Sequence, residues 1–161
     1  MRNSTLCYLV DQSSGKVLLG LKKRGFGMGK MDGIGGKQQA PESIEETAAR
    51  ELEEEIGVKV SLDALEKVGE LAFEWPAKSE WNQLVHIFLV KEWLGKPKES
   101  EEMKPEWHSV EKLPFGKMWQ CDTRFVPLML KGKKFRGKFV FKHDNETVRD
   151  FSLEEAGEGF K

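Results

Sequence analysis

The pattern of apolar and polar positions divides the chain into short strands and two helices. Six segments are rich in β-branched and aromatic residues and predict strands. They are residues 4–11, 16–21, 66–75, 81–93, 134–143 and 145–153. The polar sequence DQSSG joins the first two strands in a predicted hairpin, and the last two predict a terminal hairpin. Residues 107–115 predict a further short strand that leads into a turn.

One helix is predicted by apolar residues that recur every fourth position and therefore lie on one buried stripe. These residues are Ile44, Ala48, Leu52 and Ile56. Ser43 and Glu46 form a capping box at the start of this helix, and Gly57 is placed to end it.

A second helix is predicted over residues 123–132. Pro127 lies inside it, so this helix is short, begins near the proline or is kinked. Residues 22–37 and 95–106 predict loops rich in charge. Strands and helices are mixed without regular βαβ alternation, which favours an α+β domain with a mixed sheet. No linker rich in Pro, Gly or Ser interrupts the chain, so we predict a single domain over residues 1–161.

Composition argues against several classes of protein. The chain has 161 residues, of which 39% are hydrophobic and 33% charged, and its net charge is -1. That balance gives no global reason to expect nucleic-acid or membrane binding. No apolar segment approaches the roughly 20 residues that a membrane span needs, and the first ten residues do not resemble a signal peptide. Cys7 and Cys121 fit no metal-binding spacing and are expected to be reduced thiols of a cytoplasmic protein.

The sequence RELEEEIG at residues 50–57 concentrates negative charge on the first helix. Glu51, Glu54 and Glu55 are three and four residues apart and share one helix face, beside the apolar stripe. A solvated acidic face is the ordinary explanation. The preceding loop, residues 22–37, favours a functional explanation instead. Its glycines bring backbone carbonyls close to the helix, and its basic residues could hold phosphates. Carboxylates with a carbonyl are ligands of Mg²⁺, and this arrangement is typical of metal-assisted phosphoryl transfer to water.

Residues 36–58 resemble the Nudix box, GX5EX7REUXEEXGU, in which U is aliphatic. Gly36, Glu42 and Arg50 stand at the required spacing, and every other fixed position also matches. The resemblance implies the Nudix fold, a mixed sheet sandwiched between helices. It also implies hydrolysis of a nucleoside diphosphate linked to another moiety.

The same resemblance implies roles for the residues of the box. Mg²⁺, for which Mn²⁺ could substitute, would be held by acids of the helix and by a backbone carbonyl just before the box. The implied ligands are Glu51, Glu54, Glu55 and the carbonyl of Gly35. Arg50 would orient the carboxylates, and Glu42 would be structural.

The resemblance extends to animal MutT-type enzymes, which hydrolyse oxidised purine nucleoside triphosphates to monophosphates and pyrophosphate. It is carried by residues 17–37, 70–75, 99–107, 113–122 and 125–139. By position, Glu102 matches an acid outside the box that contributes to metal binding or base catalysis. The implied base pocket would use Phe26, Asp32, Phe73, Trp119 and Asp122. Lys22 of the basic loop is a further candidate for substrate binding, because it could hold phosphates. Trp119 would offer a flat face on which a purine stacks.

Two positions of the implied base pocket depart from this family. Animal enzymes have Asn where this chain has Asp32, and two successive Asp where it has Cys121 and Asp122. Asn donates and accepts hydrogen bonds, whereas ionised Asp only accepts them. The sequence therefore leaves the preferred base open.

We expect a cytoplasmic, monomeric hydrolase of modified purine nucleoside triphosphates that sanitises the nucleotide pool and binds neither nucleic acid nor membrane. One alternative is another Nudix substrate, such as a dinucleoside polyphosphate, ADP-ribose or capped RNA. A second is a nucleotide- or RNA-binding module without catalysis. The intact box argues against this second alternative, whereas the basic segment 131–142 keeps it open.

Overall fold

A computed structural model describes residues 1–157 and 160 of the chain. Its strands are β1 (Arg2–Asp11), β2 (Lys16–Lys22), β3 (Met31–Asp32), β4 (Leu65–Glu74), β5 (Gln83–Val90), β6 (Met103–Ser109), β7 (Phe135–Phe141) and β8 (Val148–Glu155). The two α-helices are α1 (Ile44–Ile56) and α2 (Asp122–Leu130). Short 3₁₀ helices cover Leu62–Ala64, Pro76–Trp81 and Phe115–Lys117.

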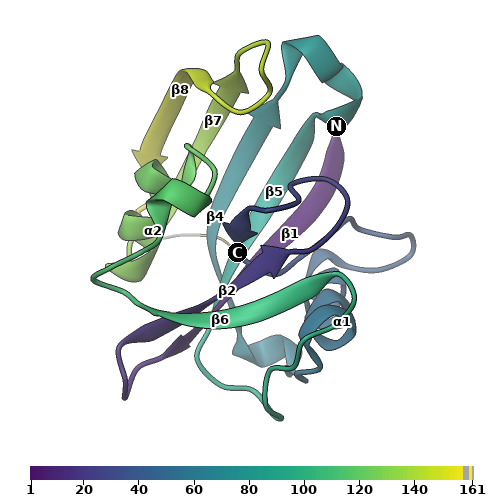
Figure 1. Cartoon of the computed structure of the whole chain (residues 1–161), viewed down its shortest axis with the longest axis vertical. Helices are drawn as coiled ribbons and strands as arrows, with labels where there is room; N and C mark the ends of the chain where they lie inside the picture. The colour runs from purple at the N-terminus through teal and green to yellow at the C-terminus, as the bar shows by residue number, and fades with distance from the viewer. Residues whose placement is uncertain (158–159, 161) are drawn as a thin grey trace.

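The strands form one mixed sheet in the order β3-β2-β1-β5-β4-β7-β8, with β6 also paired to β2 (Figure 1). The β1–β5 and β4–β7 pairs are parallel, and the others are antiparallel. The predicted hairpins β1–β2 and β7–β8 are confirmed. However, β1 pairs with β2 only next to the turn and spends most of its length beside β5.

Each face of the sheet is covered by a helix. Alternate residues of a strand point to opposite sides, so neighbouring residues of β1 pack against different helices. Cys7 and Leu9 of β1 pack in one core with residues of α1, whereas Tyr8 between them packs in the other core with residues of α2. The expected α+β architecture, with a mixed sheet between helices, is confirmed. No helix in the described part of the chain is long and apolar enough to cross a membrane.

The ends of α1 agree with the prediction. The Ser43 side chain accepts a hydrogen bond from the Glu46 backbone N–H over 3.1 Å, and the Glu46 side chain accepts one from the Ser43 N–H over 2.8 Å. Gly57 ends the helix with a φ of 71°, a left-handed conformation that favours glycine. These local contacts fix the register of α1 and thus the directions of its carboxylates.

Three local predictions need correction. Residues 103–106, predicted as part of a loop, form the start of β6, because they pair with residues 19–22 of β2 and bury Met103. Strand β3 was not predicted, since its two residues become a strand only through pairing with β2. The second helix begins one residue earlier than predicted and is short, with Pro127 inside it.

Candidate active site

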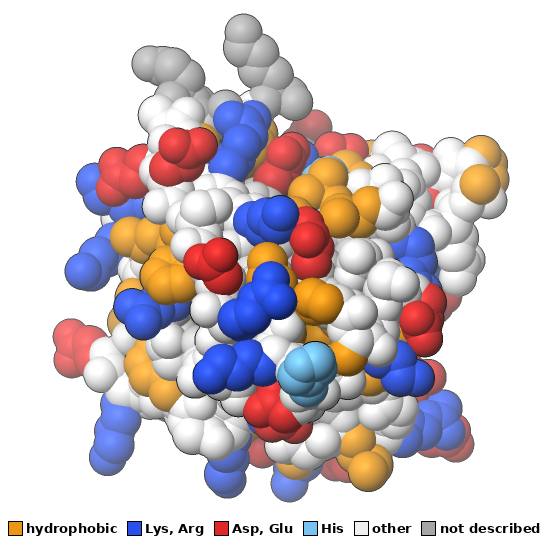
Figure 2. Space-filling model, turned by 90° about the horizontal axis from the view of Figure 1, so that it is seen from above, with side chains coloured by type: hydrophobic (Ala, Val, Ile, Leu, Met, Phe, Trp, Pro, Cys, Tyr) orange, Lys and Arg blue, Asp and Glu red, His pale blue; other side chains and the backbone are white. Residues whose placement is uncertain are grey.

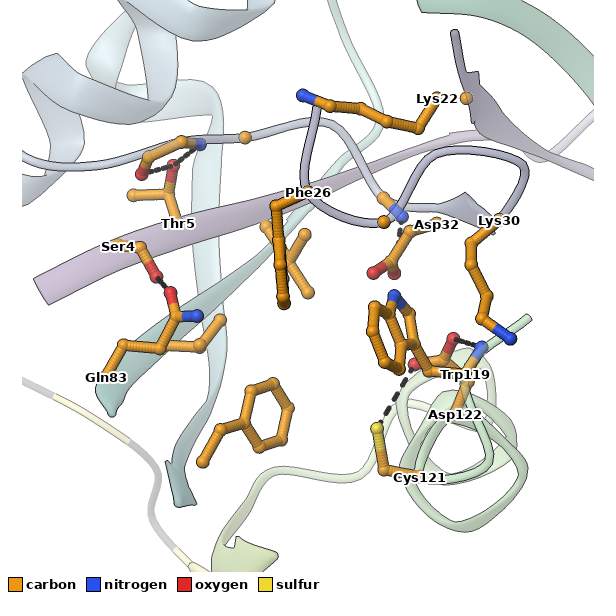
Figure 3. A pocket seen from close by; sticks show the side chains of 18 of the residues that line it. Ser4, Thr5, Lys22, Phe26, Lys30, Asp32, Gln83, Trp119, Cys121 and Asp122 are labelled. Atoms are coloured by element: carbon orange, nitrogen blue, oxygen red, sulfur yellow. Dashed lines mark hydrogen bonds between the residues drawn. The ribbon is translucent and has the colours of Figure 1, made fainter. Parts of the chain in front are cut away.

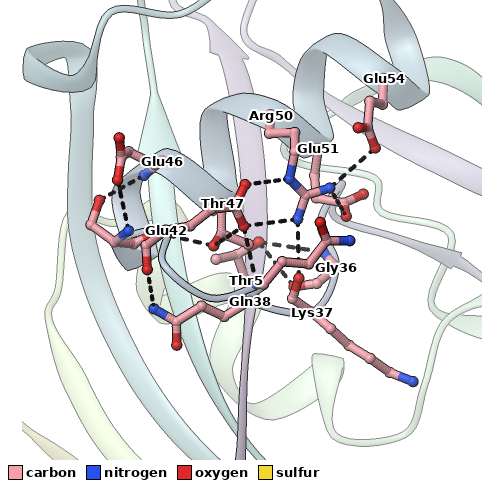
Figure 4. Close-up of polar contacts among 12 residues, drawn as sticks. Thr5, Gly36, Lys37, Gln38, Glu42, Glu46, Thr47, Arg50, Glu51 and Glu54 are labelled. Atoms are coloured by element: carbon pink, nitrogen blue, oxygen red, sulfur yellow. Dashed lines mark hydrogen bonds and ion pairs between the residues drawn. The ribbon is translucent and has the colours of Figure 1, made fainter.

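Arg50 organises the carboxylates of α1 (Figure 4). Its guanidinium donates hydrogen bonds to both oxygens of Glu42, and its Nη1 donates to Glu51 Oε1 over 2.9 Å and to Glu54 Oε2 over 3.1 Å. Its Nη2 also donates to the carbonyl of Lys37 over 3.1 Å. The hydrogen bond from Arg50 lowers the pKa of Glu42 to about 2. Arg50 therefore ties the helix to the loop that precedes it.

Glu55 is a buried carboxyl group, one oxygen of which has no hydrogen-bond donor in the described chain. Its side chain is 6% exposed, and in the described residues its Oε2 atom has no hydrogen-bond partner. Burial, followed by the charge of Glu51, raises the pKa of Glu55 to about 7. Burial also raises the pKa of Glu51, against the opposing effect of Arg50. Unpartnered carboxylate oxygen at such a site fits a divalent cation, which would supply the missing charge.

The carboxylates are not yet arranged around one point. Within residues 1–157 and 160, no three acidic, His or Cys side chains converge as the ligands of one ion. The reason is visible in Figure 4, where Arg50 draws Glu51 and Glu54 toward its guanidinium. To bind a cation, Glu51 and Glu54 would therefore have to turn from the Arg50 guanidinium toward the ion.

Gly35 and Gly36 pass between β1 and α1, where no side chain fits. A Cβ atom on Gly36 would overlap the carboxylate of Glu51, and one on Gly35 would overlap the carbonyl oxygen of Thr5. The carbonyls of Ile34 and Gly36 accept hydrogen bonds from β1. No such bond is recorded for the Gly35 carbonyl in the described chain, which leaves that oxygen available as a ligand.

Glu102 immediately precedes β6 and lies between the basic loop and the acidic helix. Its Oε1 accepts a hydrogen bond from Arg24 over 3.3 Å, and its Oε2 lies 4.0 Å from Nζ of Lys22. The charge of Glu102 also contributes to the raised pKa values of Glu51 and Glu55. The fold thus brings this acid close to the box, although nearly fifty residues separate them in the sequence.

A cavity of about 160 Å³ extends from the glycine loop to the start of α2 (Figure 3). Gly35, Gly36 and Lys22 line it on one side, and Trp119 and Asp122 line it on another. All six predicted substrate-binding residues are among its walls: Lys22, Phe26, Asp32, Phe73, Trp119 and Asp122. The structure therefore brings Lys22, the candidate for phosphate binding, into one cavity with the five residues of the implied base pocket.

Aromatic rings form much of the cavity wall. The ring of Phe26 stacks on Trp119 with centroids 5.5 Å apart and an interplanar angle of 24°. Trp75 and Phe141 stack at 4.8 Å and also line the cavity, although the sequence did not single them out. The predicted strand 66–75 contained the signal for Trp75, because residues 73 and 75 of a strand face the same side. In the structure Trp75 directly follows β4.

Asp32, which is half-buried, and Asp122, which is buried, form a carboxyl pair in the same cavity. Burial raises the pKa of Asp32 to about 6, and burial together with the charge of Asp32 raises the pKa of Asp122 well above its ordinary value. Two such groups do not both ionise near neutral pH, because the second charge would be buried beside the first.

The basic segment 131–142 does not form an uncompensated positive surface. Three of its residues on or beside β7 face acids of the parallel neighbour β4. The Nζ of Lys134 lies 3.9 Å from Glu66, Nε of Arg136 lies 3.6 Å from Glu70, and Nζ of Lys138 lies 3.2 Å from Glu74. On the face of the molecule that Figure 2 shows, basic and acidic side chains are intermixed. These pairs argue against the RNA-binding alternative.

The metal-free protein is expected to lose stability as the pH rises from about 5 to about 8. The pKa of Glu55 is about 7 in the folded chain against an ordinary value of 4.5, so the folded state holds the proton more tightly. This stabilisation is complete below pH 4.5 and is lost as the pH rises through 7. A bound cation replaces the proton, so Mg²⁺ should raise the melting temperature more at pH 8 than at pH 5.5. Thermal melts with and without Mg²⁺ measure this, and equal shifts at both pH values would contradict it.

Comparison with known proteins places these residues in a family. A family model described as the NUDIX domain matches residues 1–129. An oxidized purine nucleoside triphosphate hydrolase of Danio rerio is 50% identical over 141 residues, covering 88% of each sequence. Its namesake from Mus musculus is 47% identical over 140 residues, covering 87% of each.

The fold is also similar to a solved structure. A MutT protein from Bacillus halodurans superposes with a TM-score of 0.82 at 28% identity, covering 96% of this chain and 98% of that one. The residues that the NUDIX model matches include every site residue that the sequence predicted.

Proposed function

The chain belongs to the Nudix family of hydrolases, whose members use divalent cations, and from this premise we propose that it hydrolyses modified purine nucleoside triphosphates. The products would be the nucleoside monophosphate and pyrophosphate, and the cation would be Mg²⁺. One observation carries the proposal: a single cavity joins the Gly35–Gly36 loop beside the acidic helix to a pocket with Trp119, Asp32 and Asp122. The names of the relatives from Danio rerio and Mus musculus support the same substrate class.

The acids around α1 hold the cation in this proposal. Bound Mg²⁺ would polarise the diphosphate and lower the pKa of an attacking water. The ligands would come from Glu51, Glu54, Glu55, Glu102 and the carbonyl of Gly35. Arg50 would hold the box carboxylates in place until the cation and substrate arrive.

The other end of the cavity binds the nucleoside in this proposal. Lys22 lines the cavity and would contact phosphate oxygens. Trp119 would stack on the purine, while Asp32 and Asp122 would read its polar edge. Phe26 and Phe73 would complete the apolar walls. A site built on buried polar groups rejects bases that leave those groups unpaired.

We expect a monomer that acts in the cytoplasm and removes modified nucleotides from the precursor pool. Its substrate is a small-molecule nucleotide, and neither nucleic acid nor a membrane surface is needed. The cross-strand ion pairs between β4 and β7 support this view, because they offset the basic segment that would otherwise attract nucleic acid.

A panel of substrates tests the proposal directly. Steady-state hydrolysis with Mg²⁺ would be measured for 8-oxo-dGTP, dGTP, 2-oxo-dATP, O6-methyl-dGTP, ADP-ribose and a diadenosine polyphosphate, with the products identified. We expect kcat/KM for one modified purine to exceed that for dGTP by at least about tenfold, since a buried hydrogen-bonding site discriminates by this much or more. Pyrophosphate should be the second product. A preference for ADP-ribose or the dinucleotide would contradict the proposal.

A further inference from the structure

Tyr8 makes a contact that the proposed function has not used. It lies on β1, fully buried, and its hydroxyl donates a hydrogen bond to Oδ1 of Asp32 over 3.1 Å. The backbone N–H of Gly33 donates to the same oxygen over 2.8 Å. A Cβ atom on Gly33 would lie 2.8 Å from Cζ of Tyr8, so the ring packs directly against the backbone that carries Asp32.

These contacts leave the second oxygen of Asp32 for a ligand. Oδ2 receives no hydrogen bond from the described part of the chain, and Asp32 lines the cavity opposite Trp119 (Figure 3). The first oxygen is fixed by two donors, one from β1 and one from its own strand end. The direction of the free oxygen is thus set by Tyr8 and Gly33 together.

Asp122 is held differently, although it is 1% exposed and lines the same cavity. Its Oδ2 accepts a hydrogen bond from the N–H of Trp119 over 3.0 Å. Its Oδ1 has only a long contact of 3.9 Å from Sγ of Cys121, a weak donor. Asp32 therefore has two strong donors, and Asp122 has one.

This difference decides which member of the pair carries the charge. Hydrogen bonds donated to a carboxylate stabilise its ionised form. The other titratable groups around the pair do not change which of the two Asp side chains ionises first. Burial raises the pKa values of Tyr8 and Cys121 well above their ordinary ranges, so both stay neutral. Lys30 lies over the ring of Trp119 at 5.3 Å and pairs with Glu146 at 3.4 Å. Its charge favours ionised Asp122, but this effect is smaller than the opposing effects of burial and of the charge on Asp32.

We propose that the Tyr8 hydroxyl fixes the negative charge on Asp32, so that Asp32 accepts and the Asp122 carboxyl donates a hydrogen bond to the same purine edge. Tyr8 is then a positioning residue that sets the polarity of the base pocket. The matching ligand is a purine edge with an N–H donor beside an acceptor. The choice of ligand rests on the proposed function, but the charge assignment does not.

The first test therefore uses no nucleotide. Carboxyl carbons of ¹³C-labelled aspartate would be titrated by NMR in the wild type and in Tyr8→Phe, with signals assigned from Asp32→Asn and Asp122→Asn. We expect Asp32 to ionise before Asp122 in the wild type. Loss of the hydroxyl should raise the pKa of Asp32 by about 1, the size expected for one hydrogen bond to a charged group. Prior ionisation of Asp122, or an unchanged Asp32 titration in Tyr8→Phe, would overturn the proposal.

A protein labelled with 3-fluorotyrosine provides a second test if Tyr8→Phe does not fold. The sequence contains a single tyrosine, so growth on 3-fluorotyrosine labels Tyr8 alone. The fluorinated phenol is more acidic and a stronger donor, and it should lower the pKa of Asp32, opposite to the effect of Tyr8→Phe. Its ¹⁹F signal should also follow the ionisation of Asp32. A fluorine signal that ignores this ionisation would refute the contact.

Kinetics then connect the charge to selectivity. For the best substrate of the panel, the acid limb of kcat/KM should move to higher pH in Tyr8→Phe by the same amount as the Asp32 titration. The change should appear in KM rather than in kcat, because Tyr8 acts on binding through Asp32. A shifted titration with an unshifted kinetic limb would mean that Asp32 does not contact the base. If the wild type hydrolyses no purine triphosphate, the proposed function fails while the titrations still test the pair.

Discussion

Replacing Glu55 by Gln is expected to lower kcat/KM with Mg²⁺ by about 10³-fold, the cost of losing several kcal/mol of metal-derived stabilisation in the transition state. The substitution removes the carboxylate whose Oε2 has no protein partner in the described chain and replaces it with a neutral amide of similar size. Steady-state rates over a range of Mg²⁺ concentrations would measure the loss. Apparent Mg²⁺ affinity should fall along with turnover, because the same side chain holds the ion.

Two controls separate this effect from damage to the helix. Glu53→Gln changes an exposed acid of the same helix turn that lies outside the ligand set and should leave kcat/KM unchanged. Glu55→Gln itself should melt at a higher temperature than the wild type near pH 8 without metal, since the amide removes the cost of a buried charge. A variant of Glu55 that turns over like the wild type at every Mg²⁺ concentration would refute its assignment as a ligand.

Replacing Trp119 by Ala is expected to lower kcat/KM for the preferred purine triphosphate by roughly 10- to 100-fold. Stacking of a base on an aromatic ring contributes about 1–3 kcal/mol, and each 1.4 kcal/mol corresponds to about tenfold. The loss should appear mainly in KM, because the indole lies in the wall of the cavity away from the acids of α1. Trp119→Phe should recover part of the loss by restoring a flat ring.

Trp107→Ala is the matched control for Trp119. Trp107 stacks on Trp93 with centroids 5.9 Å apart, on a surface that does not line the cavity. Its removal should affect stability but not KM. Equal KM values for Trp119→Ala and the wild type would mean that the purine binds elsewhere, and the base-pocket assignment would have to be abandoned.

Helix α1 shows what local sequence signals can determine. The capping box, the apolar stripe and the terminal glycine are all encoded within fifteen residues, and each is found in the structure. Because helix geometry relates residues three and four apart, the shared face of Glu51, Glu54 and Glu55 could be predicted too. This segment also lies within the Nudix box of residues 36–58, which carried the family resemblance that the comparisons confirm.

Strand β6 shows what local sequence patterns cannot predict. Residues 103–106 are charged and flank a proline, so their composition predicts a loop, yet they pair with β2. Pairing between strands more than eighty residues apart depends on the whole sheet, and no short window of sequence contains that information. The same limit applies to Glu102, which reaches the acidic helix only because β6 returns beside β2.

The sequence by itself determined the acidic helix and the glycine loop before it, and it predicted six of the residues that line the cavity. Only the tertiary structure decided how those residues act on one another. It turned Arg50 toward Glu51 and Glu54, buried Glu55 without a partner, and brought Asp32 beside Asp122 across ninety residues of chain. It also brought the Tyr8 hydroxyl within hydrogen-bond distance of Asp32. The physical reason is that the protonation of a carboxyl group depends on its burial and its hydrogen-bond donors, which come from elements distant in the sequence.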